Sequence, residues 1–356
     1  MARCLLPVLK VAPLLLMLWL SFLGTKALSQ GGQKVRQVTV AQFGHVFLYM
    51  PLYVAVDRGF FKEQGLDVKL VSTGGDEKTF MSVSTGNAQF GVSDPTFAAI
   101  ARTRGQGGKV VAGIVRGVPF WVITFNKEIK KIDNAAGFKG YRIATYTAPS
   151  TSYAVMKNIL LNNGHPVDAK IVQGAFGTLL ALLKANQADM ALEIEPMVSI
   201  ATHQGARVVY SPASILGDFA FTGLTVSDDY YNKHPDEIKS AVKAISEAMN
   251  FIQKDFDGTL AVAKKEFPEV EESVLKEALK RLIQEGTIPK SPVLTKDAWD
   301  RAIALRKQLG DLHGEGSFKD NVEMKFAESA KPGSAKPGSA GVPPASKPSK
   351  PAKPAK

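Results

Sequence analysis

The sequence predicts an α/β fold of two lobes, with two mainly parallel sheets, a hinge that the chain crosses twice, and a helical C-terminal region packed on the first lobe. Three observations support this prediction. The chain has 356 residues, more than one core usually organises. Strand-like and helix-like segments alternate, and the alternation starts again in the middle of the chain. The helices that follow have no strands of their own, so they must pack on a core that already exists.

The first lobe opens with strands and helices in strict succession. From apolar runs and alternation, strands are expected at 38–40, 66–71, 90–92 and 110–115, and helices at 51–56, 77–84 and 95–104. Parallel neighbours need a crossover between them, so this order implies a parallel sheet.

The second lobe repeats the pattern. Strands are expected at 141–144, 170–172, 190–192 and 207–210, and helices at 152–162, 178–185 and 198–204. The β-rich stretch 118–125 suits a hinge, and residues 219–226 lead the chain back towards the first lobe.

The C-terminal region reads as helices. Apolar residues recur every three or four positions from Ile238 to Phe256, which is typical of an amphipathic helix. Two further helices are expected at 274–283 and 298–309. The expected division is a first lobe of residues 30–118 and 223–330, a hinge of residues 119–127 and 211–222, and a second lobe of residues 128–210.

Two terminal segments lie outside this body. In residues 1–29, Arg3 and Lys10 precede an apolar run and a small-residue sequence, the order of a cleaved signal peptide; an uncleaved anchor is the alternative. Cys4, the only cysteine, lies in this segment, so the mature chain would have no disulfide or thiolate site. Residues 331–356 are rich in Lys, Pro, Ala and Ser and predict a disordered tail, which either contacts an anionic surface or only aids solubility.

The charge belongs mostly to these ends. Of the formal net charge of +11, residues 1–29 carry +3 and residues 331–356 carry +6, which leaves +2 for the body. A nucleic-acid partner would need a basic face on the body, so we expect none.

Four segments carry a family resemblance. They are 51–68 (PLYVAVDRGFFKEQGLDV), 87–95 (NAQFGVSDP), 149–154 (PSTSYA) and 189–196 (DMALEIEP). In this order they resemble the periplasmic substrate-binding proteins of nitrate, sulfonate, taurine and thiamine-precursor ABC importers. The resemblance implies a two-lobed periplasmic-binding-protein clamp that captures a small solute and delivers it to an ABC permease in the inner membrane. It does not name the solute.

Candidate ligand-binding residues follow the strands, because ligands of open α/β sheets sit beyond the carboxyl ends of the strands. In the first lobe each candidate also has a structural alternative, namely packing under the helices, a plain turn or a helix cap. The candidates are His45 and Tyr49 after the first strand, Gly75 and Asp76 after the second, and Ser93 and Asp94 after the third.

In the second lobe, Ser150, Thr151 and Ser152 precede a helix, where hydroxyls and amides favour an acceptor or a negative group; simple capping is the alternative. Glu193 and Glu195 share one face of a strand end and favour a solute with an amino group, unless they are solvated loop acids.

Trp121 at the hinge adds an aromatic wall or belongs to the core.

Enzymatic signatures are poor. The five histidines lack metal-ligand spacing, and the chain has neither a complete nucleophile elbow nor a phosphate loop, so we expect no metal, no cofactor and no enzyme activity. The expected function is capture of an amino-sulfonate-like or aminopyrimidine-like solute by a periplasmic, monomeric binding protein. One alternative is a pyrimidine-precursor-synthesising enzyme of the related thiamine-pathway fold, which the export signal and the lack of a mature cysteine oppose. The other is a surface-interaction protein that uses the cationic tail.

Export is directly testable. The mature chain is expected to begin near Gln30 and to be recovered in the periplasm, because residues 1–29 have the order of a signal peptide. N-terminal sequencing of the protein from fractionated cells checks this. An intact N-terminus on cytoplasmic protein would reject it.

Overall fold

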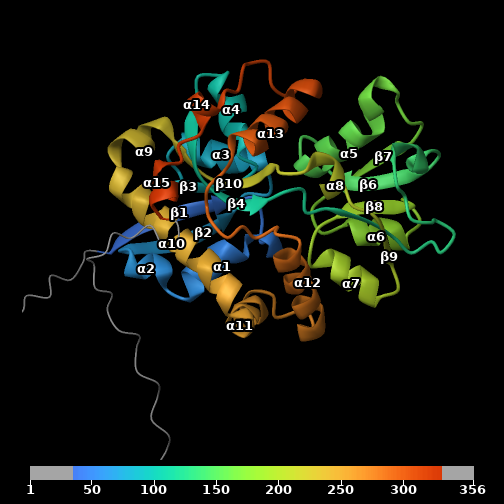
Figure 1. The fold of residues 1–356 in the computed structure, drawn as a ribbon, viewed down its shortest axis with the longest axis horizontal. Coiled ribbons are helices and arrows are strands. Elements are labelled where there is room, and N and C mark those ends of the chain that lie inside the picture. The colour runs from blue at the N-terminus through green and yellow to red at the C-terminus, as the bar shows by residue number, and fades with distance from the viewer. Residues whose placement is uncertain (1–34, 331–356) are drawn as a thin grey trace, which may run out of the picture. The chain divides into compact units, whose positions relative to one another are not determined.

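The computed structural model describes residues 35–330, so the expected signal peptide and tail lie outside the described residues. Within this range the chain forms two five-stranded sheets, each surrounded by helices (Figure 1). This confirms the predicted two-sheet α/β architecture.

The first sheet has the strand order β2-β1-β3-β10-β4. Its strands are β1 (Arg36–Gln42), β2 (Leu66–Ser72), β3 (Phe90–Ser93), β4 (Gly108–Arg116) and β10 (Ala220–Ser227). β1 pairs in parallel with β2 and β3, and Ala41 lies opposite both Val71 and Gly91. β10 is antiparallel to both β3 and β4.

The second sheet has the strand order β7-β6-β8-β5-β9. Its strands are β5 (Trp121–Thr124), β6 (Arg142–Tyr146), β7 (Lys170–Gly174), β8 (Met190–Glu193) and β9 (Arg207–Tyr210). β6 pairs in parallel with β7 and β8, and β5 is antiparallel to β8 and β9.

The two sheets therefore share one topology. In each, four strands run in one direction, as the prediction of mainly parallel sheets requires, and one strand opposes them. The opposing strand is the first one after a crossing between lobes: β5 follows β4, and β10 follows β9. The stretch interpreted as a hinge thus contributes a strand to the second sheet, because Val122 and Ile123 are buried and pair on both sides.

Helices cover the sheets. Those before β10 are η1 (Phe47–Tyr49), α1 (Met50–Asp57), α2 (Phe60–Glu63), α3 (Asp76–Ser84), α4 (Thr96–Arg102), η2 (Ala135–Phe138), α5 (Thr151–Leu161), η3 (Asn162–Gly164), α6 (Leu179–Lys184), α7 (Met197–His203) and α8 (Ala213–Leu216). Those after it are α9 (Asp228–Lys233), α10 (Pro235–Lys254), α11 (Phe256–Glu266), α12 (Glu272–Gln284), α13 (Lys296–Gln308), α14 (Phe318–Asn321) and α15 (Lys325–Ser329). No helix in residues 35–330 is both long and apolar enough to cross a membrane.

The predicted helix from Ile238 to Phe256 is α10, which ends at Lys254, and Phe256 instead begins α11. The apolar period continues across the break, but the Asp255 carboxylate accepts a hydrogen bond from the Gly258 amide and starts α11 as a new helix.

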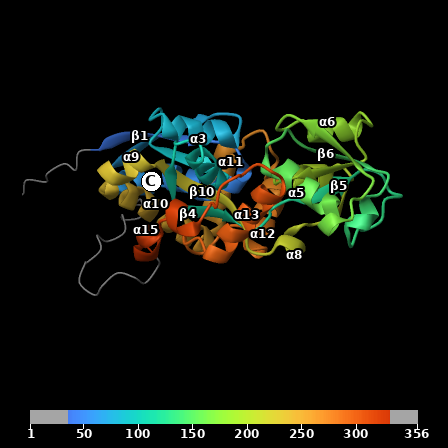
Figure 2. The same cartoon turned by 90° about the horizontal axis from the view of Figure 1, so that it is seen from above.

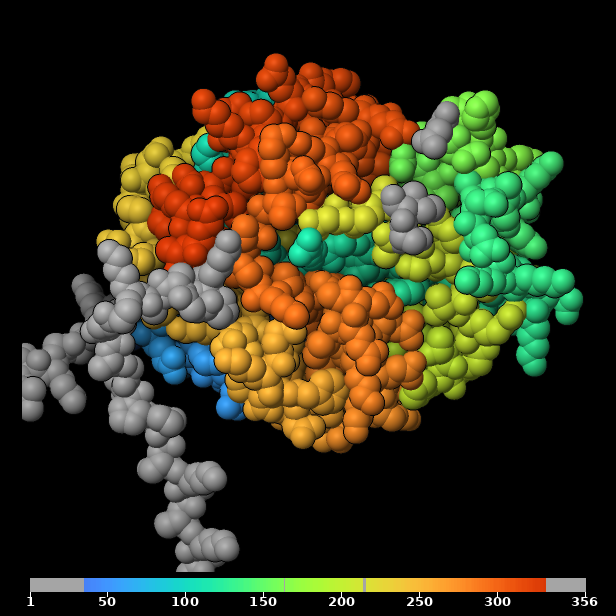
Figure 3. All heavy atoms as spheres, viewed as in Figure 1, coloured from blue at the N-terminus to red at the C-terminus, as the bar shows by residue number. Residues whose placement is uncertain are grey.

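The C-terminal helices pack more widely than predicted. α10 lies on α1 and α2 of the first lobe, as expected, while α12 also contacts α7 and α13 also contacts α5, both in the second lobe. In Figure 2 the orange helices α12 and α13 lie beside elements of both lobes, and in Figure 3 the orange surface of this region borders the green atoms of the second lobe. The C-terminal region is therefore shared between the lobes.

Close packing at β3 explains its glycine. A Cβ atom on Gly91 would lie 2.7 Å from the Thr225 hydroxyl oxygen on β10 and 2.9 Å from a Val83 methyl on α3. Only glycine lets this central strand lie so close to both neighbours.

The apolar face of α10 predicts where stability resides. Ile245 is fully buried, so Ile245→Ala is expected to lower the free energy of unfolding by about 2 to 5 kcal/mol through lost burial and the cavity left behind. Chemical denaturation checks this. Lys243→Ala on the exposed face is the control and is expected to change the free energy by less than about 1 kcal/mol; equal effects of the two variants would contradict the packing described.

Candidate functional site

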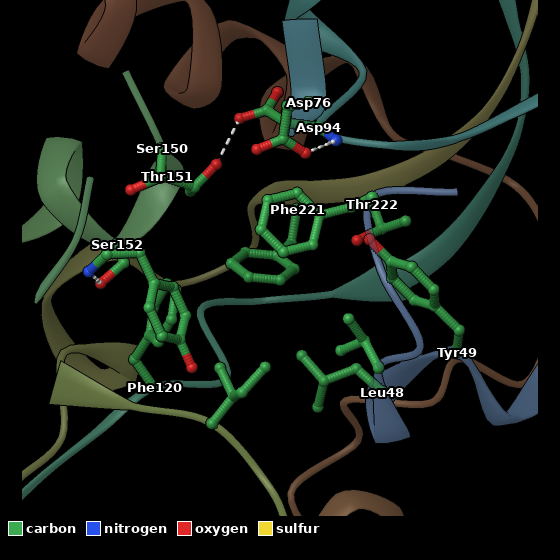
Figure 4. A pocket seen from close by; sticks show the side chains of 14 residues that line it. Leu48, Tyr49, Asp76, Asp94, Phe120, Ser150, Thr151, Ser152, Phe221 and Thr222 are labelled. Atoms are coloured by element: carbon green, nitrogen blue, oxygen red, sulfur yellow. Dashed lines mark hydrogen bonds between the residues drawn. The ribbon is translucent and has the colours of Figure 1, made fainter. Parts of the chain in front are cut away.

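A pocket of about 410 Å³ lies between the two lobes. Its lining residues lie mostly at the carboxyl ends of the parallel strands, as the strand-end rule predicts, and at the chain crossings. They are Phe43, Val46, Leu48, Tyr49, Asp76, Asp94, Phe221 and Thr222 from the first-lobe side, with Phe120, Tyr146, Ser150, Thr151, Ser152 and Ile194 from the crossing and the second lobe (Figure 4). A second hollow of about 820 Å³ shares Phe43, Asp76, Tyr146 and Ser150 with it and therefore adjoins it.

Five aromatic side chains line the pocket. Phe120 and Phe221 meet edge to face with ring centroids 5.3 Å apart. Phe43 of the first lobe meets Phe176 of the second at 5.5 Å, and Tyr146 meets Phe176 at 5.4 Å. Such walls suit a flat or apolar solute body.

The polar end of the pocket holds two carboxylates. In Figure 4, Asp76 and Asp94 lie side by side, with Thr151 across from Asp94. The backbone amide of Asp94 donates to Asp76 Oδ1 at 2.9 Å. Asp94 itself accepts from the Thr96 amide and hydroxyl and from the Thr151 hydroxyl, the last at 2.6 Å.

Arg306, on α13, balances Asp94. Its Nη2 donates to Asp94 Oδ2 at 2.7 Å, and its side chain is only 2% exposed. The same guanidinium donates to Thr96, Pro149 and Asp311 oxygens, so its donors are used within the protein. Among residues 35–330, no lysine or arginine lines the 410 Å³ pocket, whereas Lys78 lines the adjoining 820 Å³ hollow.

Of the two carboxylates, Asp76 is therefore the one that can accept further hydrogen bonds. The structure gives it one hydrogen bond, from the Asp94 amide. Burial and the negative charge of Asp94 raise the pKa of this carboxyl, and the hydrogen bond from the Asp94 amide and the charge of Arg306 only partly offset them. A donor group on a solute would supply the interaction that Asp76 lacks.

Tyr49 and the α5 start complete the predicted set in the pocket. Burial raises the pKa of the Tyr49 phenol, with a smaller contribution from Asp76, so Tyr49 is a neutral wall residue. Ser150 caps α5 by accepting from the Tyr153 amide, and the Ser152 hydroxyl accepts from the Tyr146 amide. These hydroxyls thus serve the local fold as well as lining the pocket. Gly75 lines the outer hollow.

Glu193 lies behind the pocket wall. It is fully buried and accepts hydrogen bonds from the Tyr146 hydroxyl and the Ile194 amide, while its Oε2 has no partner in the described residues. Burial raises the pKa of Glu193 to about 7, with a further contribution from the charge of Glu195, against the lowering effect of the two hydrogen bonds. Tyr146, not Glu193, meets the pocket.

Glu195 points elsewhere. Its carboxylate accepts from the Ser199 amide and hydroxyl at the start of α7 and from Arg281 Nε on α12 at 2.8 Å. Burial raises the pKa of Glu195 to about 6, and the Arg281 charge opposes this shift. Glu195 is not a lining residue of the pocket, so its contact with a solute stays a prediction without support from this geometry.

Three other predicted residues lie outside the pocket lining. His45 stacks between Tyr53 and Phe267 and contacts Glu266, at the end of α11. Ser93 is buried in β3 with no hydrogen-bond partner for its hydroxyl. Trp121 is buried under Arg281 and belongs to the core, the alternative weighed for it.

The sequence reasoning missed Tyr146, Phe221, Thr222 and Arg306. Tyr146 ends β6 and therefore carried the same strand-end signal as the residues that were chosen. The signal for Arg306 was its place on the buried stripe of α13 with Trp299 and Ala302, where an arginine needs a partner. Metal binding finds no support in residues 35–330, which hold no cluster of three or more ligating side chains.

Comparison with known proteins identifies the fold and the family of this chain. The fold is that of periplasmic binding proteins. The NMT1/THI5 like family model matches residues 47–257, more than half of the chain, and the chain belongs to this family.

Individual relatives agree in fold. The chain is 23% identical over 317 residues to a Bacillus subtilis (strain 168) protein named "Putative binding protein YtlA", covering 83% of this chain and 90% of that protein. The alkanesulfonate-binding protein SsuA of Xanthomonas axonopodis pv. citri superposes with a TM-score of 0.65 at 14% identity, over 81% and 98% of the two chains. The nitrate-binding protein NrtA of Synechocystis PCC 6803 does so with 0.67 at 15%, over 83% and 88%.

The raised pKa of Glu193 predicts a pH dependence of stability. The unfolded chain releases this proton near its ordinary value of 4.5, and the folded protein only near 7. Between these values the folded state binds more protons, so the free energy of unfolding falls as pH rises. Asp76 contributes in the same direction, since its pKa is also raised.

Glu193→Gln is expected to make this pH dependence shallower, because it removes the titrating group and keeps the shape. Thermal unfolding at half-unit steps from pH 4 to 8 measures the slope. Asp168→Asn, an exposed carboxyl of the second lobe, is the control and should leave the slope unchanged. The same slope for Glu193→Gln and the parent protein would contradict the raised pKa.

Proposed function

We propose that this protein is the exported solute-binding component of an ABC importer, working in the periplasm as a monomer that delivers its solute to an inner-membrane permease. The family, the clamp fold and a pocket lined from both lobes support the proposal. The binding proteins named above for alkanesulfonate and nitrate show which chemical classes this fold serves.

The solute we propose is a flat, polar organic compound that bears an amino or ammonium group. The observation that carries this is Asp76, an enclosed carboxylate with one hydrogen bond, facing aromatic walls. In the 410 Å³ pocket a bare anion such as nitrate would meet two carboxylates and, among residues 35–330, no lysine or arginine, since Lys78 lines only the adjoining hollow. Of the two expected classes, the aromatic walls favour an aminopyrimidine-like solute over an amino-sulfonate-like one.

Identification of the solute comes first. Mass spectrometry of compounds released on denaturing the purified protein, followed by calorimetric titration of the identified compound and of a set of aminopyrimidines and amino-sulfonates, tests the proposal. Micromolar binding of an inorganic anion with no binding of amino compounds would reject the solute class.

Asp76→Asn measures the carboxylate. The variant keeps shape but removes the charge, and a charge-assisted hydrogen bond contributes roughly 1.5 to 3 kcal/mol, so solute affinity is expected to fall about tenfold or more. Asp229→Asn is the matched control, since Asp229 also lies in the first turn of a helix but is 71% exposed. Unchanged affinity in Asp76→Asn, with an unchanged melting temperature, would remove Asp76 from the site.

A further inference from the structure

The side chain of Arg306 lies where the two lobes meet. Its guanidinium stacks on Phe97 with 5.0 Å between the guanidinium carbon and the ring centroid, and it is almost completely buried. A buried guanidinium is stable only where acceptors surround its fixed, forked donors, so its partners report which surfaces it joins.

These partners come from both lobes. Within the first lobe, Arg306 bonds to Asp94 at 2.7 Å, as well as to Thr96 and Asp311. In the second lobe, Nη1 donates to the Pro149 carbonyl at 2.9 Å and Nη2 to the Thr151 hydroxyl at 3.4 Å. The Thr151 hydroxyl in turn donates to Asp94. Both members of the ion pair thus belong to the first lobe, and its guanidinium also donates hydrogen bonds to two oxygens of the second lobe, those of Pro149 and Thr151.

Separation of the lobes would break only the hydrogen bonds that this cluster makes to the second lobe. The Arg306–Asp94 pair would stay together, while the bonds to Pro149 and Thr151 would be replaced by water. Both bonds are charge-assisted; the bond to Thr151 is buried and the bond to Pro149 is partly buried, which makes them stronger than bonds at an exposed interface.

We propose that Arg306 is a latch, a positioning residue that holds the closed arrangement of the two lobes and thereby sets the solute affinity. The proposal rests on the proposed function, because closure matters only if a solute binds between the lobes. The apparent dissociation constant is the intrinsic one divided by the fraction of molecules in the competent state. A latch that raises this fraction tightens binding without contacting the solute.

The latch is also connected to Asp76, the carboxylate proposed to bind the solute. Asp94 uses its side chain for Arg306 and Thr151 and its backbone amide for Asp76. A shift of Asp94 on release of the latch therefore changes the support of Asp76. Asp94 therefore takes part both in closure of the lobes and in the charged end of the pocket.

The test measures the distance between lobes. The only cysteine is Cys4, so the full chain with Cys4→Ser, Asn87→Cys and Lys184→Cys carries one exposed spin label on each lobe. Double electron–electron resonance then gives the distance distribution without solute, and calorimetry gives the affinity for the solute identified by mass spectrometry.

Thr151→Val is the main variant, because it removes the second-lobe hydroxyl and leaves the Arg306–Asp94 pair intact. The ratio of closed to open molecules without solute is expected to fall about tenfold. Arg306→Met should do the same if it folds, and Arg306→Lys should restore closure only partly because it lacks the fork. Arg102→Met is the control, since Arg102 pairs with Asp228 within the first lobe, and it should leave the distribution unchanged.

A distribution in Thr151→Val identical to that of the parent chain would overturn the latch, whatever happens to affinity, since Thr151 also lines the pocket. Failure of the proposed function is a different result: the parent chain would bind no solute, while the distances without solute would still report the latch.

Discussion

The buried ion pair between Arg306 and Asp94 is the interaction on which the arrangement around the pocket depends. Two charges leave water together, and the arrangement is stable only because the remaining donors and acceptors are used by Thr96, Thr151 and Pro149. Three segments that are distant in sequence therefore have to meet: the start of α4, the start of α5 and the end of α13. Each of them also borders the pocket or supports a residue that does.

Strand-end geometry and the ion pair together define what the pocket offers. The parallel strands bring loops from both lobes to one place, and the pocket lining combines five aromatic rings with two carboxylates and four hydroxyl-bearing Ser and Thr side chains. Because the donors of Arg306 are used by protein acceptors, this guanidinium cannot serve as an anion receptor. Within the described residues Asp76 has no such cationic partner, which is why the proposed solute carries an amino group.

Much of the fold could be predicted because its signals are local. Each predicted strand and helix of the two lobes exists, and the strand-end rule led to Tyr49, Asp76, Asp94 and the α5 start in the pocket. The direction of Glu195 could not be predicted, because it depends on Arg281 from a helix much later in the chain. His45 likewise turns to α11, whose position no local pattern specifies. Partners contributed by the C-terminal region decided the outcome at these residues.

The shared strand order of the two sheets bears on how the chain acquires its structure. All strands of the second sheet lie between residues 121 and 210, so this lobe can assemble from one continuous stretch. The first sheet cannot, because β10 sits between β3 and β4 and comes after the whole second lobe. Until residues 220–227 arrive, β3 and β4 each lack a neighbour and present open edges. The second lobe is therefore a natural early folding unit, and insertion of β10 completes the first.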